Sequence, residues 1–244
     1  MSKRNDNQRP IWRRTFPFLI FLIGLLMALF AFRSLWTNWR DDVAARNEYA
    51  ALRSNFESFF EPRIEAPSEE QAKAHTDMSH FSAINSDFVG WISIAGTSVS
   101  YPVVQGQDNE RYLKTTFRGE KNPAGAIFMD YRITQAFDAP ATILHGHNMR
   151  DGSMFASLPK YLDPDFLSDH PEITIVTASG EILVYEVFHA RRTSAWDPIY
   201  ALDFNDTVEA APAGASRILL TSTCTGDGDR DARVLVYALL RTNK

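Results

Sequence analysis

Cysteine is nearly absent from the sequence, because Cys224 is the only one among 244 residues. A single thiol excludes an internal disulfide and a metal cluster built from several cysteines. Free cysteine is among the most buried residue types, so one interpretation of Cys224 is a small apolar side chain in the core. The other is a reactive thiol, and position alone does not decide between them.

Basic side chains are also scarce beyond the N-terminus. Residues 1–40 contain seven Lys or Arg and one acidic residue, so the remaining 204 residues carry 18 basic and 29 acidic side chains, a net charge of −11. Nucleic-acid binding relies mainly on neutralising phosphates with a basic face. The acidic body therefore argues against nucleic acid as a partner.

The chain lacks internal repeats and low-complexity tracts. With 45% hydrophobic and 12% aromatic residues it can bury one good core, and its length predicts one domain or at most two. This composition excludes a disordered or collagen-like chain.

One long apolar run lies near the N-terminus. Residues 15–32 carry no charge between Arg14 and Arg33, and a helix of about 20 apolar residues spans a bilayer core. Basic residues precede the run and Trp36 and Trp39 follow it, so the positive-inside rule places the N-terminus in the cytoplasm and the body outside. A cleaved signal peptide is the alternative, but the run is longer than its usual apolar region and no Ala-x-Ala site follows. We expect a single-pass anchor in the cell membrane.

The next segment predicts a helix and then a linker. Residues 41–60 repeat apolar side chains every three to four positions and begin with Asp41 and Asp42, as expected for an amphipathic helix with acids in its first turn. Residues 61–76 are polar and contain two prolines, which is typical of a linker. A short helix is predicted at 78–85.

Short β-branched and apolar runs dominate the rest of the chain. Helical pieces near 110–115 and 154–163 are too few for a repeating strand–helix–strand fold. The sequence predicts a mainly β fold, an eight-stranded closed or nearly closed barrel with short peripheral helices. The expected strands are residues 89–94, 99–104, 125–129, 141–147, 172–177, 182–189, 217–224 and 233–240. The expected domains are a basic cytoplasmic tail at 1–14, a transmembrane helix at 15–32, a helical preface with linker at 33–77 and the barrel at 78–244.

Cys224 ends the predicted strand 217–224, where alternation places it on the same face as Ser222. The loop at 225–231 is rich in Gly and Asp, which a buried strand would not tolerate. We therefore expect the thiol at a barrel rim.

Two histidines, His145 and His147, end another predicted strand and point to one face, with Gly146 between them. A His-x-His pair can bind a metal, but no further ligands lie at convincing spacing, so we expect neither metal nor cofactor. Partnership with Cys224 is the favoured interpretation. A histidine can lower the pKa of a thiol or transfer protons while the thiolate attacks a carbonyl and forms a thioester.

Arg233 opens the last predicted strand, nine residues after Cys224. A hairpin would bring its guanidinium near the thiol, where it could donate hydrogen bonds to a developing oxyanion. Arg230 is the rival for this role. The alternative for Arg233 is a solvated charge at a strand edge.

Three separated motifs resemble those of sortases, the membrane-anchored transpeptidases of Gram-positive bacteria. They are ILHGH at 143–147, LLTSTC at 219–224 and ARVLVY at 232–237. Residues 101–132 and 145–163 resemble class B sortases specifically, and the similarity covers about residues 81–240. The resemblance implies a sortase-type barrel behind an N-terminal helix and anchor.

Carried over by position, the resemblance implies a nucleophile at Cys224, a catalytic histidine at His147 and a catalytic arginine at Arg233. His145 receives no catalytic role, because the family usually has an aromatic or another residue there. Positions that match the peptide groove of the family are Asn109, Leu113 and Ser222. One departure lies between the sixth and seventh strands: many class B members carry a long helix there, whereas residues 193–216 predict only a short helix near 199–204.

The implied reaction cleaves a C-terminal sorting signal of a secreted surface or pilin protein through a thioester. The acyl group then passes to an amine of the peptidoglycan precursor or of a pilin lysine. One alternative is a cysteine peptidase that uses water as acceptor. The other is a silent membrane-tethered binding module, which the intact set of Cys224, His147 and Arg233 disfavours.

Overall fold

The computed structural model describes residues 12–60, 77–202 and 217–241. Contacts divide the chain into two compact units, residues 1–44 and 45–244. The linker predicted at 61–76 and most of the basic tail predicted at 1–14 lie outside the described residues.

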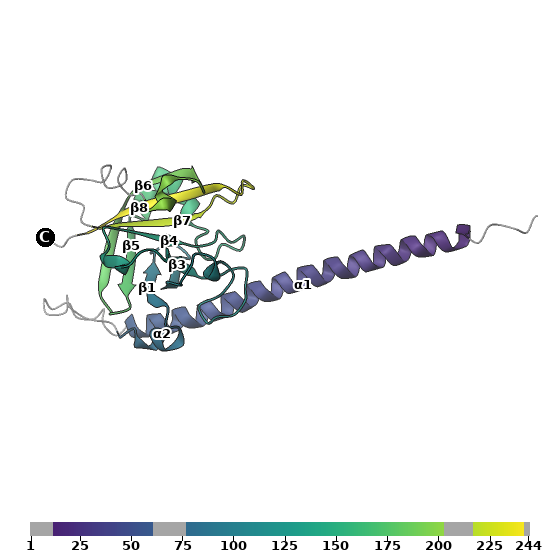
Figure 1. Cartoon of the computed structure of the whole chain (residues 1–244), viewed down its shortest axis with the longest axis horizontal. Helices are drawn as coiled ribbons and strands as arrows, with labels where there is room; N and C mark the ends of the chain where they lie inside the picture. Colours follow the sequence, from purple (N-terminus) through teal and green to yellow (C-terminus); the bar gives the residue numbers. More distant parts are fainter. Residues whose placement is uncertain (1–11, 61–76, 203–216, 242–244) are drawn as a thin grey trace, which may run out of the picture. The chain divides into compact units, whose positions relative to one another are not determined.

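The described part of the first unit, residues 12–44, is helical. Helix α1 (Trp12–Phe60) begins in it and continues without interruption into the second unit (Figure 1). Within the described part of the chain, α1 is the one helix long and apolar enough to cross a membrane. Residues 41–60 are helical as predicted, but the predicted helix start at Asp41 is wrong, because Asp41 and Asp42 lie inside α1. Residues 33–40 contain neither Pro nor Gly, so nothing in the sequence ends the helix before them.

In the second unit, one face of α1 is buried against the barrel. Its buried side chains recur every three or four residues and are Ala45, Tyr49, Leu52 and Phe56. The ring of Phe56 stacks on Trp91 with centroids 4.3 Å apart and planes 5° apart. The Tyr49 hydroxyl donates to the Gly125 carbonyl at 2.5 Å and accepts from the Phe117 amide at 3.3 Å. This segment of α1 is therefore part of the barrel's core.

Eight strands form one closed barrel in the order β1-β2-β3-β4-β7-β8-β6-β5, which confirms the predicted fold class. The strands are β1 (Phe88–Ser93), β2 (Ser100–Val104), β3 (Ile127–Met129), β4 (Ala141–His145), β5 (Glu172–Thr177), β6 (Ile182–Ser194), β7 (Ile218–Cys224) and β8 (Ala232–Leu240). Pairing of β1 with β5 closes the barrel. The β2–β3 and β4–β7 pairs are parallel, and the other pairs are antiparallel.

Two strands end more than one residue away from the prediction, and β3 begins at Ile127 instead of residue 125. Strand β6 continues to Ser194 instead of ending at His189, because its backbone pairs with β8 as far as the Ser194–Ala232 pair. Strand β4 ends at His145 instead of His147. At Gly146 the chain passes so close to Ile127 that an added Cβ would lie 2.4 Å from that side chain.

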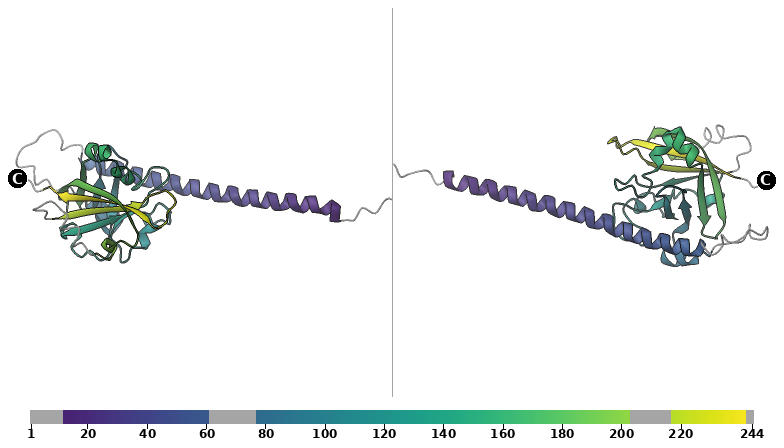
Figure 2. Two further views of the ribbon diagram at one scale, coloured as in Figure 1. Left: turned by 90° about the horizontal axis from the view of Figure 1, so that it is seen from above. Right: turned by 180° about the vertical axis from the view of Figure 1, so that it is seen from behind.

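Short helices fill the connections. They are α2 (Ser79–Ile84), η3 (Arg111–Leu113), η4 (Ala136–Asp138), η5 (Leu158–Leu162), α3 (Pro164–Asp169) and η6 (Pro198–Ala201). The sequence did not predict η4 or α3, although Asp163 caps α3 by accepting from the Asp165 amide. Helix η5 packs against β6, β7 and β8 (Figure 2). The helix predicted near 199–204 is η6, and residues 203 and 204 lie outside the described residues.

Two apolar clusters lie on opposite faces of β4, β7 and β8. Leu219 belongs to the main core, whereas its neighbour Leu220 belongs to a second cluster that also contains Ile143 and Leu235. Ile199 of η6 covers this second cluster. The candidate site lies farther along the same face, near the C-terminal ends of β4 and β7.

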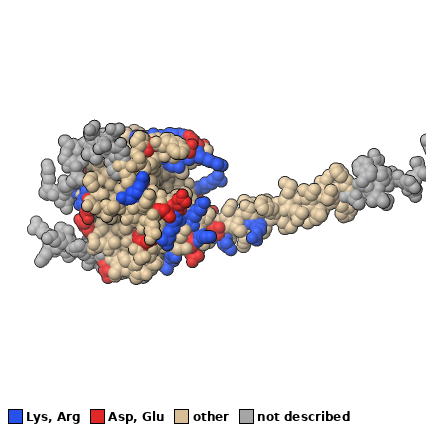
Figure 3. All heavy atoms as spheres, in the orientation of Figure 1, with Lys and Arg blue, Asp and Glu red and all other residues tan. Residues whose placement is uncertain are grey.

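Basic and acidic side chains lie next to one another on the surface shown in Figure 3.

Candidate active site

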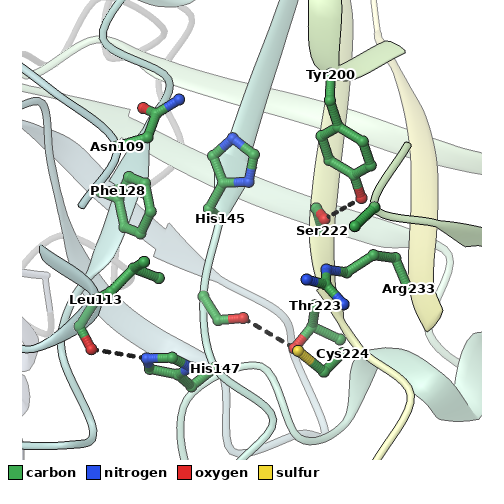
Figure 4. Close-up of a pocket in the computed structure, with 12 residues that line it drawn as sticks. Asn109, Leu113, Phe128, His145, His147, Tyr200, Ser222, Thr223, Cys224 and Arg233 are labelled. Atoms are coloured by element: carbon green, nitrogen blue, oxygen red, sulfur yellow. Dashed lines mark hydrogen bonds between the residues drawn. The ribbon is translucent and has the colours of Figure 1, made fainter. Parts of the chain in front are cut away.

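A pocket of about 420 Å³ opens where β4 and β7 end and β8 begins (Figure 4). All six residues that the sequence singled out line it, and they are Asn109, Leu113, His147, Ser222, Cys224 and Arg233. These residues come from four separate segments of the chain. The barrel topology is what brings them together.

The hairpin of β7 and β8 positions the thiol and the arginine. Cys224 is half-buried at the end of β7 and pairs in register with Arg233 of β8. Arg233 Nη1 donates to the carbonyls of Arg230 and Ala232 at 2.7 and 3.0 Å. Figure 4 shows the guanidinium extending toward Thr223 and Cys224. The side chain is thus held at the pocket by its own loop, and it is not a free charge at a strand edge.

His147 lies on the other side of the pocket, just beyond β4. Its Nε2 lies 2.8 Å from the Leu113 carbonyl oxygen. A carbonyl oxygen can only accept, so Nε2 carries the proton and Nδ1 is the nitrogen able to accept one in the neutral ring. Among the described residues, no hydrogen bond joins His147 to Cys224, although both line the same pocket.

A buried carboxylate anchors the far end of the pocket. Asp130 is 1% exposed and accepts from Arg132 Nε at 2.8 Å, Arg132 Nη2 at 2.7 Å and Asn109 Nδ2 at 2.7 Å. His145 Nε2 lies 3.7 Å from the same carboxylate. Burial alone would raise the pKa of Asp130, but Arg132, His145 and Asn109 outweigh it and hold that pKa well below its ordinary range.

Aromatic rings line the pocket beside His145. The imidazole stacks on Phe128 with centroids 5.2 Å apart and lies 6.1 Å from the Tyr200 ring. Burial raises the pKa of Tyr200 to about 12, so its hydroxyl stays protonated at neutral pH. That hydroxyl lies 2.7 Å from Ser222 Oγ, which couples η6 to β7.

Comparisons with known proteins agree with this arrangement. A profile of the sortase domain family matches residues 92–241. Sortase B of Listeria monocytogenes is 38% identical over 178 residues, covering 65% of this chain and 72% of the relative. Sortase B of Staphylococcus aureus is 31% identical over 185 residues, covering 76% of this chain and 72% of the relative.

The chain belongs to the class B sortases. A Staphylococcus aureus sortase B–substrate complex superimposes with a TM-score of 0.67 at 28% identity, over 84% of this chain and all of that structure. A Clostridium perfringens sortase B gives a TM-score of 0.60 at 27% identity, over 67% of this chain and 99% of that structure. The protein is thus a cysteine transpeptidase of the sortase type, as the three sequence motifs predicted.

In this sortase the pocket contains groups that the sequence did not single out. Phe128, Ala195 and Tyr200 line it, and Asp130 accepts hydrogen bonds from the lining residue Asn109 and from Arg132. The sequence carried little signal for them, because Ala195 and Asp130 each follow the end of a strand directly, whereas Phe128 lies within β3 and Tyr200 within η6. The predicted groove residue Asn109 lines the pocket, but its amide is engaged by Asp130 and by the Tyr131 amide.

The connection after β6 corrects one boundary. Residues 193 and 194 belong to β6, so the connection in this sortase begins at Ala195, whose amide donates to the Asp231 carbonyl at 2.7 Å. Within the described ranges, no three His, Cys, Asp or Glu side chains are placed to hold a metal ion. His145 and His147 therefore belong to no such group among the described residues.

Proposed function

We propose that this sortase cleaves the C-terminal sorting signal of a secreted surface or pilin protein and joins the remaining acyl group to an amine. The observation that carries the proposal is the meeting of Cys224, His147 and Arg233 in one pocket. In a sortase, this set supplies a nucleophile, a proton carrier and a hydrogen-bond donor for an oxyanion.

In the first half-reaction, the Cys224 thiolate attacks the scissile carbonyl carbon. A C–S bond forms, the peptide C–N bond breaks, and His147 gives its proton to the leaving amine. Arg233 donates to the carbonyl oxygen while that oxygen carries negative charge. The product is a thioester on Cys224 and a released C-terminal segment.

In the second half-reaction, an amine attacks the thioester carbon. The amine loses a proton to His147, a C–N bond forms, and the thiolate of Cys224 leaves. A sortase B has been crystallised with triglycine, and a Streptococcus pyogenes class B sortase is involved in pilus biogenesis. These relatives support two acceptor types, a peptide amine of the cell-wall precursor and a pilin lysine.

The sorting signal is proposed to lie along the pocket wall formed by Asn109, Leu113 and Ser222. These residues line the same pocket as His147 and Cys224 (Figure 4). The proposed organisation places residues 1–14 in the cytoplasm, a membrane anchor at 15–32, a preface at 33–77 and the catalytic barrel at 78–244 outside the cell. The apolar stretch of α1 supports the anchor.

The test uses the full chain in detergent with a peptide that copies the sorting signal of a secreted protein encoded beside this gene. Mass spectrometry of the product is compared with and without triglycine. Transfer predicts a new peptide–triglycine amide that Cys224→Ala and His147→Ala both fail to make. Only free acid, at the same rate with and without triglycine, would identify a hydrolase instead.

The orientation is tested on intact cells stripped of their wall. Added protease should remove a C-terminal tag and spare an N-terminal one. A protected C-terminal tag would reverse the proposed orientation, and a mature chain that starts after residue 32 would show that the apolar segment is a signal peptide.

A further inference from the structure

The parallel ladder between β4 and β7 stops just short of the reacting groups. Its last residue pair is His145 with Ser222, and its last backbone hydrogen bond runs from the Gly146 amide to the Ser222 carbonyl at 3.2 Å. Cys224 and His147 both lie beyond this point. Backbone pairing therefore does not fix the separation of these two residues.

Two side-chain hydrogen bonds continue where the ladder stops. Thr223 Oγ1 donates to the Gly146 carbonyl at 2.9 Å, which Figure 4 shows as a dashed line. Asn148 Nδ2 donates to the Cys224 carbonyl at 3.0 Å. One bond acts on the residue before His147 and the other comes from the residue after it. We name this pair of side chains, Thr223 and Asn148, the clasp.

Thr223 of the clasp is shielded from water, and the loop that carries the partly exposed Asn148 is held by further contacts. Thr223 is 2% exposed, so water does not compete for its hydroxyl. Asn148 forms a β-bridge with Met154, and the Phe155 amide donates to the His147 carbonyl at 2.8 Å. The backbone of His147 is thus held from three directions.

The loop after Cys224 is shaped around the clasp. Gly226 has φ +81°, and a Cβ added there would lie 2.7 Å from Asn148 Nδ2. Gly228, two residues later, has φ +96°, but an added Cβ would meet nothing within 4 Å. Both positions need the backbone freedom of glycine, yet only Gly226 needs the space.

We propose that Thr223 and Asn148 are positioning residues that fix the His147 backbone relative to the Cys224 thiol. The proposal rests on the proposed function, in which His147 exchanges protons at Cys224. The Leu113 carbonyl already fixes one ring nitrogen of His147, so the remaining freedom of the ring follows its backbone. The rate of such a step falls steeply when the reacting groups are misplaced, and a displacement of about 1 Å costs on the order of 10²-fold in rate.

The first test compares two threonines of one strand face. Thr223→Val removes the hydroxyl of the clasp at nearly constant volume. Thr221→Val is the matched control, because Thr221 Oγ1 is buried and has no hydrogen-bond partner in the described part of the chain. With the sorting-signal peptide and triglycine, Thr223→Val should lower kcat about 10- to 100-fold with KM within about twofold, since positioning and not peptide binding is lost.

Two further comparisons separate positioning from general damage. Thr223→Ser keeps a donor and should restore most of kcat. Asn148→Asp keeps the shape but presents only acceptors to the Cys224 carbonyl, so it should lose as much as Thr223→Val. Gly226→Ala should lower kcat far more than Gly228→Ala, although both strain the backbone. Melting curves of every variant check that it is folded.

A second readout needs no peptide. Cys224 is the only thiol, so its alkylation by iodoacetamide can be followed by intact mass. Thr223→Val should change the alkylation rate by at least about threefold, and the change should vanish in a His147→Ala background, because coupled residues are not additive.

Each failure is distinct. If wild-type protein does not turn over the peptide, or if His147→Ala turns it over normally, the proposed function fails, and the alkylation comparison still tests the clasp. If His147→Ala is inactive while Thr223→Val and Asn148→Asp keep the wild-type kcat, the clasp alone is refuted. An equal loss in Thr221→Val and Thr223→Val refutes it as well.

Discussion

Replacing the buried carboxylate of Asp130 should destabilise the protein strongly. Asp130 is 1% exposed and accepts two side-chain hydrogen bonds from Arg132 and one from Asn109. In Asp130→Asn one oxygen becomes an NH₂ group that faces these donors, and the charge that pairs with Arg132 disappears. The change in size is negligible, so the loss is electrostatic.

The size of this loss of stability depends on the fact that only Asp130, and not its partner Arg132, is fully buried. Breaking a buried ion pair costs about 3–5 kcal/mol. The Arg132 side chain is 34% exposed, so water takes over part of its charge and the lower end, about 3 kcal/mol, applies. For a chain of this size each kcal/mol lowers Tm by about 2–4 °C, so the expected loss is about 6–12 °C at pH 7.

The same pair sets the sign of the pH dependence. The pKa of Asp130 is lowered from its ordinary 3.8 in the folded state. Its contribution is therefore complete above that value and is lost as pH falls toward the folded-state pKa. The gap in Tm between wild type and Asp130→Asn should be constant from about pH 5 to 8 and should narrow below about pH 4.

Thermal unfolding by near-ultraviolet circular dichroism in detergent measures the gap. Asp138→Asn is the control, because Asp138 pairs with Arg217 at 2.6 Å while its side chain is 80% exposed. Such a surface pair contributes under about 1 kcal/mol. Equal Tm losses in the two variants, or a gap that stays constant down to pH 3, would refute the reasoning.

Two other predictions concern Arg233, with Arg230 as its control, and Tyr49. Arg233→Lys should lower the acylation rate by about 10²–10³, because an ammonium lacks the planar donor fork of a guanidinium. Arg230→Lys should stay near wild type in the same peptide-cleavage assay under identical salt. A larger loss in Arg230→Lys than in Arg233→Lys would reassign the oxyanion donor to Arg230. Tyr49→Phe leaves the buried Gly125 carbonyl and Phe117 amide without their partner, so the urea midpoint should fall by an amount equivalent to about 1–3 kcal/mol with m unchanged. An unchanged midpoint would mean that water replaces the phenol.

The sequence predicted the strands because most of them bury apolar side chains. It also predicted that Arg233 would lie across the hairpin from Cys224, and the register confirms this, since the two residues are direct partners. Strand β6 was cut short in the prediction because its end, residues 191–194, carries polar and charged side chains. Backbone pairing with β8 extends that strand, and backbone pairing leaves no signature in hydrophobicity.

The sequence could not predict the hydrogen-bonded polar residues beside the pocket. Asp130, Arg132 and Asn109 meet because a turn after β3 lies beside the loop before η3, and Arg132 reaches the Tyr200 carbonyl 68 residues away. No local spacing encodes such a meeting. The continuity of α1 was not predicted for another reason. Its first part is apolar on all sides and its last part is amphipathic, so one helix shows two different sequence patterns.

The position of β8 has a consequence for biosynthesis. This strand is the last of the eight in chain order, and it lies between β7 and β6 in the barrel. A nascent chain leaves the ribosome N-terminus first, so β5 and β6 emerge long before the strand that joins them to β7. Barrel closure must then wait for β8, and until that strand emerges the edges of β6 and β7 that it pairs with are unpaired and open to aggregation or to a chaperone.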